Sequence, residues 1–164
     1  GGELTWSAPA GWQPYAGHVR ERDHSDERPR DRNQGYRSDF NFSFVGLRGE
    51  ITPIWKISGE HIWETGRVPM YGSNGHRQPQ SSNAYLISSR VLQEGVAVYE
   101  YDLIYARGDN DRRSVTASGN GTDSRIGRSD HNFFYFGHVD TGLAYAPRIS
   151  NMVIHHAGAT IHVP

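Results

Sequence analysis

The sequence predicts an all-β protein, a single antiparallel domain of the β-sandwich or jelly-roll kind with long polar loops and an irregular N-terminal arm. Two observations carry this prediction. Apolar and polar residues alternate with a period of two in several segments, as they do in half-buried strands. No window carries the 3.6-residue apolar period of an amphipathic helix, because glycines interrupt every candidate. Roughly eight to ten short strands separated by turn signals would form a sandwich, a jelly roll or a small closed sheet.

The first 35 residues differ in composition from the rest and predict an arm or linker, with the β domain spanning 36–164. Residues 1–17 are rich in Gly, Pro and Ala, with aromatic rings interspersed. Residues 18–32 alternate five arginines with five acids. Such self-neutralising charge is typical of a solvated loop, and the alternative is a segment that docks on another subunit.

Strands are then expected in order along the chain. Phe40, Phe42 and Phe44 lie two residues apart, which puts all three rings on one face of the first strand. The best hairpin candidate joins 84–92 to 95–106, and aromatic residues fill one face of its second strand. The remaining expected strands are 50–57, 61–64, 114–117, 132–139, 149–155 and 159–163, and the expected long loops are 66–83 and 118–129.

Composition excludes several kinds of chemistry. The 164 residues contain no cysteine, which excludes disulfides, Cys-ligated zinc, iron–sulfur clusters and thiol catalysis. The 17 basic residues are interleaved with 18 acids, and the near-neutral total argues against a nucleic-acid partner. No apolar run approaches the roughly 18 residues that a membrane helix needs, so no membrane insertion is expected.

Aromatic rings beside polar loops give the favoured functional interpretation. An exposed ring can stack on the apolar face of a sugar while neighbouring amide, carboxylate and guanidinium groups bind its hydroxyls. The polar loops after Trp63 and around Arg107 carry this mixture, with the alternative that Trp63 is a core residue. The expected ligand-binding residues are Trp63, Tyr71, Asn74, His76, Arg77, Arg107 and Asp109.

The sequence therefore favours a non-enzymatic domain that binds a polysaccharide or a cell-surface glycan. A β-rich, cysteine-free composition with many Gly, Asn, Ser and Tyr residues is similar to that of the receptor-binding tips of phage tail fibres and tailspikes. This interpretation implies a homo-oligomer, with a trimer favoured, at an extracellular or virion surface. One alternative is a structural virion subunit of the capsid, decoration or head-fibre type, whose arm wraps a neighbour.

The other alternative is a polysaccharide-degrading jelly-roll enzyme. Glu100 and Asp102 lie two apart on one expected strand and hence on one face, and glycosidases use two carboxyl groups. The competing interpretation is a solvated or ion-paired strand face. No nucleophile elbow and no phosphate-binding loop is present.

No cofactor is expected, with Ca²⁺ as the one candidate metal. Asp109 and Asp111 begin a D-x-D pattern like that of many calcium loops, but arginines follow where an EF-hand needs glycine and a distant glutamate. Nine histidines are a high number, yet no H-x-H or HExxH spacing occurs, so they are interpreted as polar sheet residues.

Overall fold

The computed structural model describes residues 1–22, 39–69, 77–93, 96–108, 131–133 and 151–161. Strands make up 83% of the described chain and none of it is α-helical, which confirms the all-β prediction. A single 3₁₀ turn, Pro9–Gly11, interrupts the strands. Among the described residues, no helix has the length and apolar character needed to cross a membrane.

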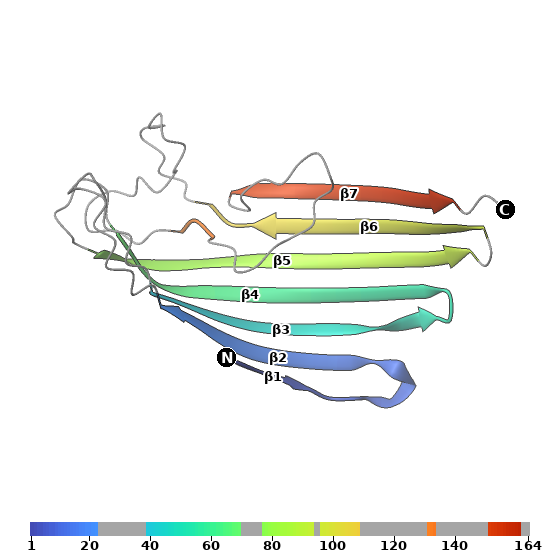
Figure 1. Ribbon diagram of the computed structural model, residues 1–164, viewed down its shortest axis with the longest axis horizontal. Helices are drawn as coiled ribbons and strands as arrows, with labels where there is room; N and C mark the ends of the chain where they lie inside the picture. Colours follow the sequence, from blue (N-terminus) through green and yellow to red (C-terminus); the bar gives the residue numbers. More distant parts are fainter. Residues whose placement is uncertain (23–38, 70–76, 94–95, 109–130, 134–150, 162–164) are drawn as a thin grey trace.

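Seven strands form one antiparallel sheet in which each strand pairs with its neighbours in the sequence (Figure 1). The order β1-β2-β3-β4-β5-β6-β7 is that of a simple meander. The strands are β1 (Gly2–Thr5), β2 (Gln13–Arg22), β3 (Asp39–Thr52), β4 (Trp55–Pro69), β5 (Arg77–Gln93), β6 (Ala97–Ala106) and β7 (Met152–Ile161).

This sheet is open, and the described residues form no second sheet against it. The sandwich or jelly-roll arrangement expected from the sequence is therefore not seen in this part of the chain. Both outer edges, β1 and β7, have a strand partner on one side only.

The residues expected to form an arm belong to the sheet as far as Arg22. Residues 2–5 and 13–22 pair as β1 and β2, and β2 continues the sheet against β3. The physical reason lies in the glycines, because Gly17 stands opposite Phe44 and leaves room for its ring. The expected domain boundary at residue 35 lies outside the described residues.

The described strands are longer than the sequence indicated. The expected loop 66–83 is mostly strand, since β4 continues to Pro69 and β5 begins at Arg77. Pro53 lies in the turn between β3 and β4 instead of inside a strand. The two expected C-terminal strands are one strand, β7, which runs through Gly158. The expected strand 114–117 and most of 132–139 lie outside the described residues.

The connections differ in length between the two ends of the sheet. At one end β3 and β4 are joined by residues 53–54, β5 and β6 by 94–96, and β1 and β2 by 6–12. At the other end the connections are 23–38, 70–76 and 107–151. Figure 1 shows the short turns together at the right and the ends that enter the longer connections at the left.

The small core lies on one face at the long-connection end. It comprises Phe40, Phe42, Ile62, Ala84, Ile104, Ala106 and Phe133. Residues 131–133 are held on this face by hydrogen bonds, from Gln80 Nε2 to the Asn132 carbonyl and from Ser82 Oγ to the His131 carbonyl, both 2.7 Å. Phe133 is 2% exposed and belongs to the same buried cluster as Phe40 and Phe42 of β3.

Candidate functional site

Most charged side chains of the strands lie on one of the two faces of the sheet. Successive side chains of a strand point to opposite faces, so the register fixes which residues share a face. One face, here called the polar face, also carries the core and the segment 131–133. Its charged strand residues are Glu3, Glu21, Arg48, Glu50, Lys56, Glu60, Glu64, Arg90, Glu100 and Asp102.

The opposite face, here called the uncharged face, has no Asp, Glu, Lys or Arg over most of its length. This holds from Trp55 to Trp63 on β4, from Ala97 to Tyr105 on β6 and along the whole of β7. It holds as well for the outward positions of β5 from 83 to 91, where outward means pointing to the uncharged face. Among the residues whose side chains the structure describes, charged outward ones occur only at the long-connection end, and they are Arg20, Arg22, Asp39, Arg67 and Arg107.

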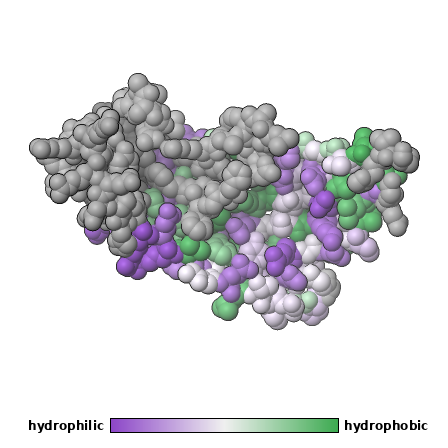
Figure 2. Space-filling model, viewed as in Figure 1, coloured by the Kyte–Doolittle hydropathy of each residue, from purple (hydrophilic) through white to green (hydrophobic). Residues whose placement is uncertain are grey.

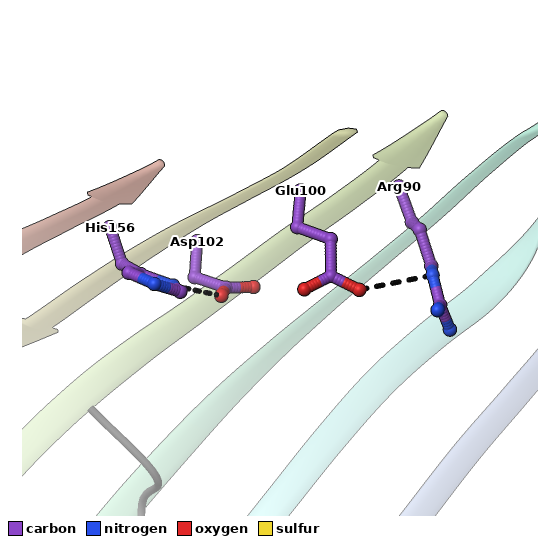
Figure 3. Close-up of polar contacts among 4 residues, drawn as sticks. All are labelled: Arg90, Glu100, Asp102 and His156. Carbon is purple, nitrogen blue, oxygen red and sulfur yellow. Dashed lines mark hydrogen bonds and ion pairs between the residues drawn. The ribbon is translucent and has the colours of Figure 1, made fainter. Parts of the chain in front are cut away.

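Ion pairs link neighbouring strands across the polar face. Arg90 Nε lies 3.1 Å from Glu100 Oε1, and His156 Nδ1 lies 3.0 Å from Asp102 Oδ2. Figure 3 shows these four side chains projecting from the same side of the sheet, side by side. The two carboxylates thus share a face, as their spacing indicated, and each has a basic partner on an adjacent strand. Figure 2 shows hydrophilic residues spread over the face in view, with hydrophobic ones between them.

A hollow of about 300 Å³ opens on the polar face across β2, β4, β5, β6 and β7. Tyr15, Glu60, Asp102 and His156 contribute its polar lining, with aliphatic side chains between them. Burial and a hydrogen bond to Glu60 raise the pKa of Tyr15 to about 12. The hollow therefore offers hydroxyl, imidazole and carboxylate groups to a polar solute.

Glycines on β2 and β3 let aromatic rings lie flat on the polar face. A Cβ on Gly46 would stand 2.1 Å from the Tyr15 ring, and one on Gly17 would stand 2.2 Å from the Phe44 ring. The guanidinium of Arg48 lies over the Tyr15 ring at 5.5 Å from its centroid. Two reciprocal pairs of ring and glycine thus hold β2 against β3 on this side.

Large apolar and aromatic side chains stand exposed on the uncharged face. Ten of them are between 38% and 55% exposed, namely Val45, Leu47, Trp55, Trp63, Tyr85, Ile87, Tyr99, Tyr101, Tyr105 and Val153. They come from five adjacent strands, β3 to β7, and form one continuous surface. Extended exposed apolar surfaces of this kind mark a contact with a protein, a ligand or a membrane.

An aromatic row crosses the uncharged face near its long-connection end. The His61 ring lies 4.0 Å from the Trp63 ring and 4.1 Å from the Tyr85 ring, and Tyr85 lies 5.8 Å from Tyr105, all between centroids. Asn83 Nδ2 lies within hydrogen-bond distance of the Tyr85 hydroxyl, at 3.4 Å. Burial among these groups lowers the pKa of His61, which keeps the ring neutral at pH 7.

The structure brings together two of the residues predicted to bind a ligand. Trp63 stands opposite Asn83, and the Arg107 amide donates a 3.0 Å hydrogen bond to the Asn83 carbonyl. Trp63 is 41% exposed and is not a core residue. Arg77 is the first residue of β5. The other predicted ligand-binding residues, Tyr71, Asn74, His76 and Asp109, lie outside the described residues.

The calcium candidates Asp109 and Asp111 lie outside the described residues as well. Within the part of the chain that the structure describes, no three His, Asp or Glu side chains converge as metal ligands. The Glu100 and Asp102 pair is described, and its ion pairs match the competing interpretation of a charged strand face.

Sequence reasoning missed the segregation of charge between the two faces. The signal was present in the alternation along each strand, for example Tyr99, Tyr101, Leu103 and Tyr105 against Glu100 and Asp102. It was interpreted as a half-buried strand. Comparison of the chain with protein-family models, with curated proteins and with solved structures found no match.

Proposed function

We propose that this sheet spans a lipid bilayer, with the uncharged face in contact with acyl chains and the polar face toward a water-filled space through which polar solutes pass. The observation that carries the proposal is the segregation of charge described above. In a water-soluble antiparallel sheet the apolar face packs on a core and the charged face meets solvent. Here the charged face carries the small core and the hollow, while the described large apolar side chains of the other face stand exposed.

The dimensions of the uncharged face support a bilayer as its partner. The span from Trp55 to Trp63 covers nine residues, as do those from Ala97 to Tyr105 and from Val153 to Ile161. A strand needs about 9–11 residues to cross a membrane when it is tilted. At about 3.3 Å per residue the spans reach about 27 Å along the strand. A tilt of about 40° reduces this to about 20 Å across the membrane, somewhat less than the apolar band about 25 Å tall of membrane-spanning sheets.

Topology gives independent support. Sheets that cross an outer membrane are antiparallel meanders with short turns on one side and longer loops on the other. The described strands have this arrangement, with 53–54 and 94–96 at one end and 23–38 and 107–151 at the other. The expectation of no membrane insertion considered only helices, and this proposal replaces it.

The proposal requires partners for the two sheet edges, because a bilayer offers no water to unpaired backbone groups. β7 has no proline and no Asp, Glu, Lys or Arg along its ten positions, which are the residues that commonly block pairing at a sheet edge. In the simplest case other copies of this chain supply the strands, which accords with the homo-oligomer expected from the sequence.

The test is insertion into phosphatidylcholine vesicles with two arginine variants. Ile87 points to the uncharged face and its neighbour Ser88 to the polar face of the same strand, β5. Chain refolded with vesicles is floated on a density gradient and then washed at alkaline pH. We expect the wild type and Ser88→Arg to stay with the vesicles, and Ile87→Arg to be lost, since an arginine facing lipid costs about 2–4 kcal/mol at mid-depth.

Two results would overturn the proposal. The first is a wild-type chain that folds in buffer as a stable species and ignores vesicles. The second is equal retention of the two arginine variants, which would show that the faces are not distinguished by lipid. Protein recovered only as aggregate without vesicles accords with the proposal, because the exposed face then has no partner.

Glycan binding is the second candidate function, and the exposed row of His61, Trp63 and Tyr85 beside Arg107 favours it. A flat aromatic surface fits the apolar side of a sugar ring. Glycan-array binding that is lost in Trp63→Ala would support this candidate. Binding unchanged in that variant, or no binding by the wild type, would remove it.

A further inference from the structure

Arginines border the uncharged face at one end only. Arg20 of β2, Arg67 of β4 and Arg107, directly after β6, all point outward there and are exposed. Arg107 lies level with Trp63, because its amide is hydrogen-bonded to Asn83, the residue opposite Trp63. Arg20 is level with Thr65, through Asn41, and so lies one outward position further along the sheet. Arg67 lies one outward position beyond Thr65. The three thus occupy a narrow border at the long-connection end.

These arginines are available to an external anion. Within the described residues, no ion pair joins Arg20, Arg67 or Arg107 to a carboxylate. The border also holds Arg22 and one acid, Asp39, which stands between Arg22 and Arg67 in the register. Positive charge therefore exceeds negative charge among the described border residues. The arginines of the polar face differ, because Arg90 is paired with Glu100 and Arg48 lies over Tyr15.

The opposite end of the uncharged face has no such border. The outward residues at that end carry no charge. They are Trp55 on β4, Val91 and Gln93 on β5, and Ala97 and Tyr99 on β6. Trp55 Nε1 instead donates a 2.9 Å hydrogen bond to Ser89 Oγ. The positive border is therefore a property of one side of the sheet, and its partner is expected on one side of the membrane.

We propose that Arg20, Arg67 and Arg107 bind the phosphate groups of anionic lipid headgroups in the leaflet at the long-connection end. This inference rests on the proposed function, since it needs the uncharged face to contact acyl chains. A guanidinium presents a planar fork of donors that matches phosphate oxygens, and cationic side chains beside the hydrocarbon region attract anionic headgroups. Trp63, level with Arg107, supplies the aromatic ring that commonly lies at the depth of headgroups.

The experiment measures binding to phosphatidylcholine vesicles with and without phosphatidylglycerol. The variants are Arg67→Gln, the triple variant Arg20→Gln/Arg67→Gln/Arg107→Gln, and Arg90→Gln as the matched control on the polar face. We expect phosphatidylglycerol to tighten wild-type binding, by about five-fold for each arginine that reaches a headgroup. The triple variant should lose this gain and still insert into phosphatidylcholine, and Arg90→Gln should keep it. Salt should weaken the gain by screening.

The outcomes separate this inference from the proposed function. Insertion into phosphatidylcholine with no gain from phosphatidylglycerol, or an equal loss in Arg90→Gln, overturns the headgroup site and leaves the membrane proposal standing. Binding only to phosphatidylglycerol vesicles that salt fully reverses overturns the membrane proposal, and with it the inference. A gain abolished by inorganic phosphate at constant ionic strength would assign the arginines to free phosphate and overturn the lipid site.

Discussion

The imidazole ring of His61 stacks on the phenol ring of Tyr85, with 4.1 Å between centroids, on the uncharged face of the sheet. This contact joins β4 to β5 within the exposed apolar surface, near its long-connection end. Protonation of His61 would place a cation there, and burial already lowers its pKa.

Acid should therefore destabilise the sheet through His61. Because the folded pKa lies below the ordinary 6.5, the unfolded chain binds more protons, and stability falls as pH drops through and below 6.5. We expect His61→Phe to flatten the fall in the urea midpoint between pH 7.5 and pH 5.5, measured in vesicles. His18→Phe is the control, and an equal flattening in that variant would contradict the assignment to His61.

Tyr15 should titrate well above the ordinary tyrosine pKa of about 10. Tyr15 has a pKa of about 12 through burial and its hydrogen bond to Glu60. A raised tyrosine pKa gives stability that is complete below pH 10 and is lost between pH 10 and pH 12. Tyrosinate absorbance should show a late step that is missing in Tyr15→Phe and shifted to lower pH in Glu60→Gln. A late step that persists in Tyr15→Phe would assign it to another residue.

Two glycines should respond differently to alanine. A Cβ on Gly46 meets the Tyr15 ring, whereas one on Gly59 has no atom nearer than 3.9 Å. We expect Gly46→Ala to cost about 1–3 kcal/mol in free energy of unfolding, as overpacking does. Gly59→Ala should be neutral or stabilise by up to about 1 kcal/mol, because glycine is poor in a strand. Equal effects would mean that the ring does not rest on Gly46.

The ion pairs of the polar face should contribute little to stability. Asp102 and His156 lie 3.0 Å apart with side chains 32% and 40% exposed. A double-mutant cycle with Asp102→Asn and His156→Gln should give a coupling of about 0.2–1 kcal/mol at pH 6, as for other exposed pairs. A coupling several times larger would show that the hollow excludes water, which the proposed water-filled space does not allow.

The sequence predicted the all-β class and the faces of single strands better than the arrangement of the strands into layers. Phe40 and Phe42 share a buried face, and β5 and β6 form the expected hairpin, because period-two alternation is a local property. Whether a second layer covers a face depends on partners, which alternation does not specify. The alternation put the rings of Tyr99, Tyr101 and Tyr105 on one face but did not say whether that face is covered, and the three rings are exposed.

The candidate site shows the same limit. Spacing alone placed Glu100 and Asp102 on one face, but their partners Arg90 and His156 come from neighbouring strands, and pairing register is not local. Trp63 was predicted to bind a ligand because a polar loop was expected directly after it in the sequence. Its contact with His61 and its position level with Arg107 required the register of three strands.

The most direct test of the central proposal uses the absence of cysteine, which lets a single introduced cysteine carry a spin label without competition. Labels are placed in turn at Tyr85, Leu86, Ile87 and Ser88 in vesicles, and collisions with oxygen and with a water-soluble nickel complex are measured. We predict high oxygen and low nickel collision rates at 85 and 87, and the reverse at 86 and 88. Nickel access at 85 and 87, or no alternation along the four positions, would contradict a lipid-facing sheet.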